Sequence, residues 1–283
     1  MAAPMTIGIV GSGIMGAGVA EVAARAGFDV VARSRTQAAA DEMVAMIDRG
    51  LARAVERGRL SVDERSAIVA RIRPTDRIGD LAGCSLVIES VVEDLAVKKE
   101  LFTQLDEVVA ADAILATNTS TLPVIEMAMA TRRPDRVCGI HFFNPAPAMA
   151  LVEIIRPLTA SDDTIRAATE FARQCGKDPV EVKDRAGFIV NALLFPFLNN
   201  AVRMWEQGTA SIDHIDAAMK GACNFPMGPF QLLVLVGLDT SVAILEALHA
   251  EFGDPNYTPT PTLRRMVAAG HLGRKSRQGF YQY

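Results

Sequence analysis

Two residues of this 283-residue chain, His141 and Glu153, occupy positions suited to acid–base chemistry. His141 ends an apolar run at 137–141, and Glu153 is the one charged residue in a second apolar run at 151–155. A carboxylate buried in a strand needs a partner, and His141 is the obvious candidate. The carboxylate would hold the imidazole in one tautomer and stabilise its protonated form. Such a histidine can take the proton of an alcohol while a hydride leaves the neighbouring carbon. The pair predicts a general base with an orienting carboxylate, and a purely structural histidine is the alternative.

A glycine-rich sequence directly follows the first apolar run, at residues 6–10. It reads Gly11-Ser12-Gly13-Ile14-Met15-Gly16 and opens a helical segment at 14–26. In such a turn the first glycine makes the bend, and the second lets the backbone approach a pyrophosphate. The third lets the helix pack on the strand, so that the phosphates lie at the helix N-terminus. These six residues therefore predict a dinucleotide-binding site.

The residue that follows the second predicted strand, 29–33, indicates which dinucleotide binds. An acidic side chain there would hold the ribose 2′-hydroxyl of NAD. Here Ser34 stands at that position, between Arg33 and Arg35. A serine with guanidinium neighbours can receive a 2′-phosphate through charge-assisted hydrogen bonds, whereas a carboxylate would repel it. We expect NADP(H) to be favoured, with NAD(H) as the alternative if the arginines are only solvated loop charges.

These residues require a parallel sheet to bring them together. Short β-branched runs at 6–10, 29–33, 85–89, 113–117 and 137–141 alternate with helical segments, a pattern typical of βαβ units. The polar cluster 117–121 and the sequence His141-Phe142-Phe143-Asn144-Pro145 both follow such strands, at the edge where open α/β sheets bind ligands. An insertion at 38–72 has helical periodicity, an arginine-rich face, Gly58 and a Ser61–Glu64 capping pattern, which predict a projecting helical hairpin.

From residue 184 onward the alternation of strands ends. Helices are predicted at 187–207, 212–222, 228–252 and 262–269. We therefore expect a Rossmann-like, mostly parallel α/β domain over 1–184 and an all-helical domain over 185–283 for substrate binding and dimerisation. Two of these helical segments are apolar around almost their whole circumference, which favours a homodimer over a merely buried central helix.

Composition excludes several classes of function. With a formal net charge of −4, the chain lacks the broad positive potential typical of nucleic-acid-binding proteins. No apolar stretch of the sequence reaches the ~18 residues that a membrane span needs. Four scattered cysteines have no spacing typical of a metal site or a disulfide framework. With 50% hydrophobic and 22% charged residues, we expect a soluble, cytoplasmic protein without a metal, a nucleic-acid partner or membrane attachment.

The chain resembles the short, monofunctional 3-hydroxyacyl-CoA dehydrogenases, in particular bacterial 3-hydroxybutyryl-CoA dehydrogenases. The resemblance covers residues 7–283 and rests on ordered motifs. Besides the glycine-rich turn and the His141 motif, these are residues 92–98, 118–120, 187–191, 226–229, 237–239 and 279–281. It implies reversible hydride transfer between NAD(P)(H) and C3 of a short (3S)-3-hydroxyacyl-CoA, in fatty acid metabolism.

The resemblance also implies roles for individual residues. His141 corresponds to the catalytic base and Glu153 to the carboxylate that orients it, while Ser120 and Asn191 correspond to residues that bind the substrate near its 3-oxygen and thioester carbonyl. Contacts with the nicotinamide half of the cofactor are implied for Glu93, Lys98, Asn118, Asn144 and Arg274.

The hairpin resembles the arm that meets CoA. This gives Arg53, Arg57 and Arg59 a role in phosphate binding, with an ordinary solvated face as the alternative. Ser34 departs from the acidic residue that the family usually has, which puts NAD in doubt. Small residues at Ala146 and Ala148 suggest an altered acyl pocket. Three other functions stay open: a dehydrogenase of carrier-bound 3-hydroxyacyl groups, a sugar-acid dehydrogenase, and a non-catalytic dinucleotide-binding protein.

Overall fold

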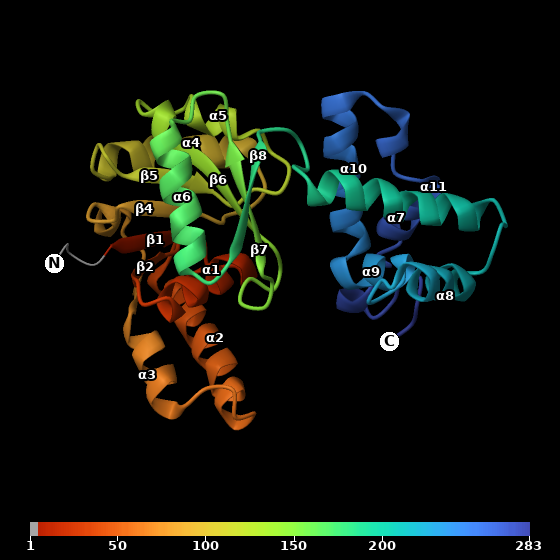
Figure 1. The fold of residues 1–283 in the computed structure, drawn as a ribbon, viewed down its shortest axis with the longest axis horizontal. Helices are drawn as coiled ribbons and strands as arrows, with labels where there is room; N and C mark the ends of the chain where they lie inside the picture. The colour runs from red at the N-terminus through yellow and green to blue at the C-terminus, as the bar shows by residue number, and fades with distance from the viewer. Residues whose placement is uncertain (1–4) are drawn as a thin grey trace. The chain divides into compact units, whose positions relative to one another are not determined.

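The computed structural model describes residues 5–283 and divides into two compact units (Figure 1). The first ends at Asp184 and the second runs from Arg185 to Tyr283. The first unit is built on an eight-stranded sheet and the second is helical.

The sheet of the first unit has the strand order β3-β2-β1-β4-β5-β6-β7-β8. Neighbouring strands pair in parallel except β6 and β7, which are antiparallel. The order reverses between β1 and β4, the position at which open α/β sheets bind ligands. The predicted mostly parallel α/β class is confirmed. The strands are β1 (Thr6–Val10), β2 (Asp29–Arg33), β3 (Ile72–Thr75), β4 (Leu86–Glu89), β5 (Ile114–Thr117), β6 (Val137–Phe142), β7 (Leu151–Arg156) and β8 (Asp178–Lys183).

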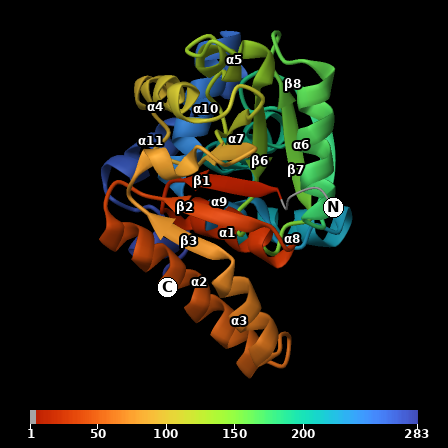
Figure 2. The ribbon, with the colours of Figure 1, turned by 90° about the vertical axis from the view of Figure 1, so that its left-hand side faces the viewer.

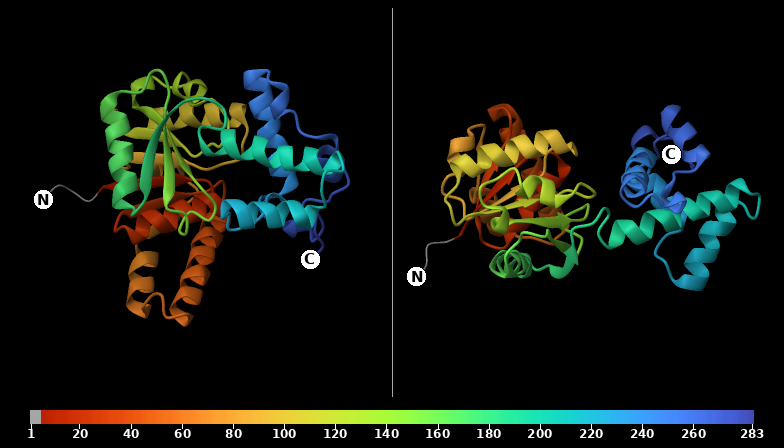
Figure 3. Two further views of the ribbon diagram at one scale, coloured as in Figure 1. Left: turned by 45° about the vertical axis from the view of Figure 1, so that its right-hand side comes forward. Right: turned by 90° about the horizontal axis from the view of Figure 1, so that it is seen from above.

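Helices cover both faces of this sheet. Buried side chains of α1, α2 and α6 share one hydrophobic core with β1, and Phe28 stacks on Phe171 within it, with ring centroids 5.5 Å apart. The right-hand view of Figure 3 shows α4 and α6 on opposite sides of the strands. The longer helices of the unit are α1 (Ile14–Arg25), α2 (Gln37–Glu56), α3 (Val62–Ala70), α4 (Leu95–Val108) and α6 (Asp162–Gln174), with short helices at Ile78–Leu81, Val124–Ala128 (α5) and Pro134–Arg136.

The predicted helical hairpin is present as α2 and α3, which extend away from the sheet (Figure 2). Gly58 has a φ of +66° in the connecting turn, a conformation that glycine adopts without strain. The capping box at the start of α3 is also present, because Ser61 Oγ accepts from Glu64 N at 3.1 Å and Glu64 Oε2 accepts from Ser61 N at 2.7 Å.

Two strands of the sheet, β3 and β8, were not predicted from the sequence. Both lie at the ends of the strand order, and both contain a proline, Pro74 or Pro179. Most residues of β8 are exposed, so it lacks the apolar run by which buried strands are recognised.

The second unit packs five helices around its own core, in which Phe230, Leu198 and Leu248 are fully buried. These helices are α7 (Val190–Glu206), α8 (Ile212–Cys223), α9 (Pro229–Val236), α10 (Leu238–Phe252) and α11 (Pro261–Ala268), with short helices at Pro255–Tyr257 and Arg274–Ser276.

The single helix predicted over 228–252 is wrong. It is two helices, α9 and α10, bent by 96° at Gly237, whose φ of +104° ends the first helix. Within residues 5–283, no unbroken helix has both the length and the hydropathy of a membrane span. Only α9 and α10 taken together reach them.

Candidate active site

His141 and Glu153 face each other across the one antiparallel pair of the sheet. They are register partners on β6 and β7, so their side chains leave the sheet on the same face. His141 Nδ1 lies 2.8 Å from Glu153 Oε2, and both residues are buried, with 4% and 0% of their surface exposed. The hydrogen bond expected from the sequence is therefore present. It suits an imidazole that keeps its proton on Nδ1 and leaves Nε2 as the acceptor.

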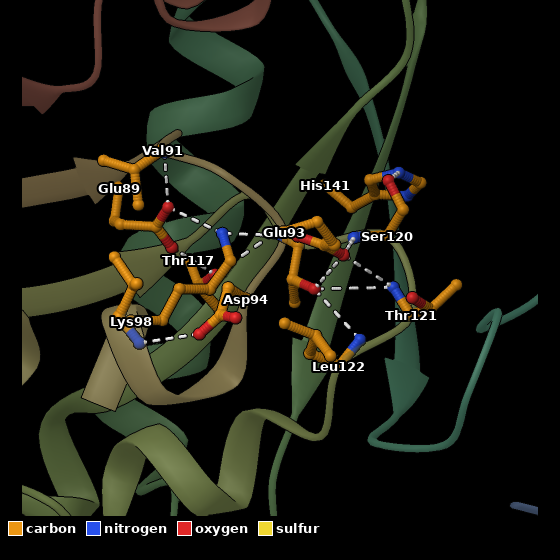
Figure 4. Close-up of polar contacts among 12 residues, drawn as sticks. Glu89, Val91, Glu93, Asp94, Lys98, Thr117, Ser120, Thr121, Leu122 and His141 are labelled. Carbon is orange, nitrogen blue, oxygen red and sulfur yellow. Dashed lines mark hydrogen bonds and ion pairs between the residues drawn. The ribbon is translucent and has the colours of Figure 1, made fainter. Parts of the chain in front are cut away.

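Ser120 lies at the other nitrogen of the same ring. Its Oγ is 3.2 Å from His141 Nε2. Ser120 belongs to the loop after β5, and Glu93 binds this loop: Glu93 Oε1 accepts from Thr119 Oγ1 at 2.6 Å and from the amides of Ser120 and Thr121 at 2.9 and 3.3 Å. Figure 4 shows Glu93 between this loop and the pair formed by Glu89 and Lys98.

A cavity of about 790 Å³ opens at the ends of β1, β2 and β4. It takes in the glycine-rich turn after β1, the residues after β2, the loop after β4 and one side of α4. The lining residues are Val10, Gly11, Ser12, Gly13, Ile14, Met15, Arg33, Ser34, Arg35, Ser90, Val91, Val92, Val97, Glu100, Leu101, Gln104 and Asn144.

The glycine-rich turn fits the phosphates of a dinucleotide. Among the described residues no side chain caps the N-terminus of α1 at Gly13, so the first amides of the helix can bind an anion. A Cβ at Gly13 would meet no atom within 4 Å, which leaves room for a ligand against the backbone. A Cβ at Gly16 would lie 1.9 Å from Gly11 O, so only glycine allows α1 to approach the turn. These residues can hold a dinucleotide.

Ser34 and its two arginine neighbours lie on the wall of this cavity. Ser34 is 6% exposed, and its Oγ lies 2.8 Å from Ser12 Oγ in the glycine-rich turn. Arg33 Nε is buried and has no hydrogen-bond partner among residues 5–283. This side of the cavity therefore offers hydroxyl and guanidinium donors.

Of the residues expected to contact the nicotinamide half of the cofactor, Glu93, Lys98 and Asn118 lie in the first unit but not on the cavity wall. Glu93 and Lys98 belong to the polar network of Figure 4, with Lys98 only 1% exposed. Asn118 Oδ1 accepts from Phe142 N at 2.8 Å and so links the loop after β5 to β6. Asn144 does line the cavity.

The loop that connects β6 to β7 is held by a buried lysine. Lys177 Nζ donates to Ala146 O at 2.7 Å and to Met149 O at 2.8 Å. Burial lowers the pKa of Lys177 from its ordinary value. These bonds fix the segment between the strands of His141 and Glu153, which also includes Asn144.

The remaining predicted residues lie elsewhere. Asn191 is in α7 of the second unit and is 7% exposed. Arg274 is in the same unit, with its guanidinium carbon 5.5 Å from the centroid of the Tyr283 ring. Arg53, Arg57 and Arg59 are exposed at the end of the α2–α3 hairpin. No cluster of three or more potential metal-ligating side chains occurs in the described part of the chain.

Sequence reasoning missed the contribution of α4 to the cavity. Val97, Glu100, Leu101 and Gln104 line it from one side of this helix. Their spacing of three and four residues is a helical face, which could have been recognised directly after the loop of Ser90–Val92.

Comparisons with known proteins show the family to which the chain belongs. Two family models match the chain, the NAD-binding domain of 3-hydroxyacyl-CoA dehydrogenase over residues 6–185 and the C-terminal domain of the same enzyme over 187–283. A 3-hydroxybutyryl-CoA dehydrogenase of Mycobacterium tuberculosis is 46% identical over 279 residues, with 98% of each chain covered. One of Clostridioides difficile is 44% identical over 279 residues, with 99% of each chain covered.

A solved structure is also similar to this chain over nearly its whole length. The crystal structure of (S)-3-hydroxybutyryl-CoA dehydrogenase from Ralstonia eutropha matches with a TM-score of 0.96 and 41% sequence identity, and 99% of each chain is covered. The resemblance expected from the sequence motifs is confirmed, and the NAD-binding domain over residues 6–185 supports a nicotinamide dinucleotide cofactor. The chain belongs to the 3-hydroxyacyl-CoA dehydrogenase family.

Proposed function

We propose that this enzyme transfers a hydride reversibly between NADP(H) and C3 of a short-chain (3S)-3-hydroxyacyl-CoA, such as 3-hydroxybutyryl-CoA. The observation that carries the proposal is the buried His141–Glu153 pair with Ser120 Oγ beside Nε2 of the imidazole. The relatives named 3-hydroxybutyryl-CoA dehydrogenase support the short acyl chain.

The residues of the chain account for the proton transfer. A bound nicotinamide ring would accept or supply the hydride. With Nδ1–H donated to Glu153, His141 offers Nε2 to the 3-hydroxyl of the substrate and takes its proton during oxidation, while the Glu153 carboxylate stabilises the imidazolium. In reduction His141 returns this proton to the 3-oxygen. Ser120 Oγ is placed to bind the same oxygen, and the family resemblance assigns Asn191 to the thioester side.

We infer NADP(H) as the cofactor from the residues on one side of the cavity. Ser34, Arg33 and Arg35 lie together on its wall, and the buried Nε of Arg33 lacks a partner among the described residues. The acidic residue of the wall, Glu100, comes from α4 rather than from the end of β2. Such a site suits a 2′-phosphate, and NADPH would make reduction of the 3-ketoacyl-CoA the working direction.

Oxidation of NADPH and of NADH by the purified enzyme, with acetoacetyl-CoA as acceptor, tests both parts of the proposal. We expect a higher kcat/KM with NADPH. A preference for NADH would keep the reaction and refute the cofactor assignment. No turnover with either cofactor would refute the CoA thioester as substrate.

A variant of Ser34 isolates the cofactor argument. Ser34→Asp places a carboxylate where the 2′-phosphate would bind, and like charges brought together cost several kcal/mol. We expect the NADPH/NADH ratio of kcat/KM to fall by about 100-fold. Ser34→Asn, which adds similar volume without charge, is the control and should change the ratio far less.

We also propose the assembly and location of the enzyme. It acts as a homodimer in the cytoplasm, with the second unit providing the dimer contacts and the α2–α3 hairpin binding the phosphates of CoA. Apolar side chains exposed on α7 and the exposed arginines of the hairpin support these assignments.

A further inference from the structure

Glu89 is a buried carboxylate with no part in the reaction described above. It is the last residue of β4 and 0% exposed. Its Oε1 accepts from Lys98 Nζ and from Val91 N, each at 2.6 Å, and its Oε2 accepts from Thr117 Oγ1 at 2.8 Å. Both oxygens of Glu89 are therefore bound by donors from three different parts of the chain.

Lys98 connects Glu89 to a second carboxylate. Its ammonium lies 2.6 Å from Glu89 Oε1 and 3.3 Å from Glu93 Oε2, and the side chain is 1% exposed. A buried ammonium needs anionic partners, and the shorter of these two contacts is with Glu89. The position of Lys98 therefore depends on Glu89, and Lys98 in turn bridges to Glu93.

Glu93 connects Lys98 to the loop after β5, which contains Ser120. Its Oε2 faces Lys98, while its Oε1 accepts from the amide of Ser120 at 2.9 Å. Ser120 Oγ lies 3.2 Å from His141 Nε2. Figure 4 shows these side chains in sequence, with Glu89 and Lys98 at one end, Glu93 in the middle, and Ser120 and His141 at the other.

The same carboxylate also borders the cofactor site. Val91, whose amide donates to Glu89, is a residue of the cavity wall, and Val10 is the register partner of Glu89 on β1. Glu89 thus contacts the wall of the dinucleotide cavity and, through two further side chains, the loop of Ser120.

We infer that Glu89 is a positioning residue for this reaction. It fixes the Lys98 ammonium, which holds the Glu93 carboxylate in place, and Glu93 sets the loop that presents Ser120 to the imidazole of His141. The inference rests on the proposed function, because Ser120 and His141 are assigned there to the substrate oxygen. A displacement of about 1 Å in such a site can lower a rate about 100-fold.

Three variants test this role: Glu89→Gln, Lys98→Met and the double variant. We expect Glu89→Gln to lower kcat with acetoacetyl-CoA about 10- to 100-fold, a larger factor than any rise in the dissociation constant of NADPH measured without substrate. If Glu89 acts through Lys98, the double variant should be no slower than Lys98→Met alone, because the two residues form one path. Glu107→Gln, an exposed glutamate on the same helix as Lys98, is the control and should keep the wild-type kcat.

Two outcomes would overturn the inference: an unchanged kcat in folded Glu89→Gln, or losses of the two single variants that multiply in the double variant. Should Glu89→Gln fail to fold, the double variant removes both buried charges and still tests the role, because wild-type kcat in it would refute the path. If the wild-type enzyme does not reduce acetoacetyl-CoA, the proposed function fails separately. In that case a crystal structure of Glu89→Gln tests the positioning role of Glu89. Loss of the hydrogen bond between Glu93 and the Ser120 amide would support this role, and an unmoved Ser120 loop would refute it.

Discussion

At the scale of single residues, the contact between His141 and Glu153 does two things at once. The carboxylate has no solvent to stabilise it and needs a donor, while the histidine needs one nitrogen protonated and the other free. The bond of 2.8 Å meets both needs and directs Nε2 toward Ser120. The contact could be predicted because a single charged residue in an apolar strand requires a partner.

Substitutions of His141 and Glu153 distinguish the contribution of the catalytic base from that of the carboxylate that orients it. His141→Gln removes the base and should lower kcat for acetoacetyl-CoA reduction by about 10²- to 10⁴-fold, the range of general acid–base catalysis. Glu153→Gln should also lower kcat, and the double variant should be no slower than His141→Gln, because residues that act as a unit are not additive. His214→Gln, on the exposed surface of α8, is the control. Wild-type turnover by His141→Gln would contradict the mechanism.

At the scale of elements, burial decided what the sequence could predict. Strands β1, β4 and β5 are apolar runs buried in the sheet, and their predicted bounds differ from the observed ones by at most one residue. Edge strands β3 and β8 have no such run. The break at Gly237 was missed because the apolar pattern continues through it, and only the backbone φ of +104° reveals the bend.

The network around Glu89 could not be predicted for a different reason. Its members come from β4, the loop after β4, α4, β5 and the loop after β5, and their contacts span up to 28 residues of sequence. Which carboxylate meets which donor depends on strand register and on the placement of α4, and neither is visible in local patterns. Family resemblance supplied Glu93 and Lys98 but gave no role to Glu89.

The α2–α3 hairpin carries a prediction of its own, since Arg53 and Arg57 lie exposed near its end. If they bind the phosphates of CoA, replacing both by alanine should raise the KM for acetoacetyl-CoA about tenfold, in line with the loss of charge-assisted hydrogen bonds. The KM for acetoacetyl-pantetheine, which lacks the nucleotide phosphates, should not change. Arg166→Ala, on the exposed surface of α6, is the control. Equal effects on both thioesters would refute a phosphate contact.

At the scale of the whole molecule, exposed apolar surface on the second unit calls for an explanation. Leu193, Phe197 and Met204 are spaced along one face of α7, and Leu193 and Met204 are 71% and 45% exposed. Phe197 also contacts Phe225, with ring centroids 5.6 Å apart. An apolar face of this kind is typical of an interface, and because most soluble oligomers are symmetric homo-oligomers, we expect a second copy of the chain as the partner.

The oligomeric state tests this interpretation directly. In light scattering, the 30.4 kDa chain should have the mass of a dimer. The double variant Leu193→Glu, Met204→Glu would bury two carboxylates without partners in such an interface. We therefore expect this double variant to be monomeric. Leu158→Glu is the matched control, because Leu158 is 97% exposed on the first unit and should tolerate a charge without change in mass. A wild-type monomer would refute the dimer, and a double variant that remains dimeric would place the contact elsewhere; either result would leave the face of α7 to another function.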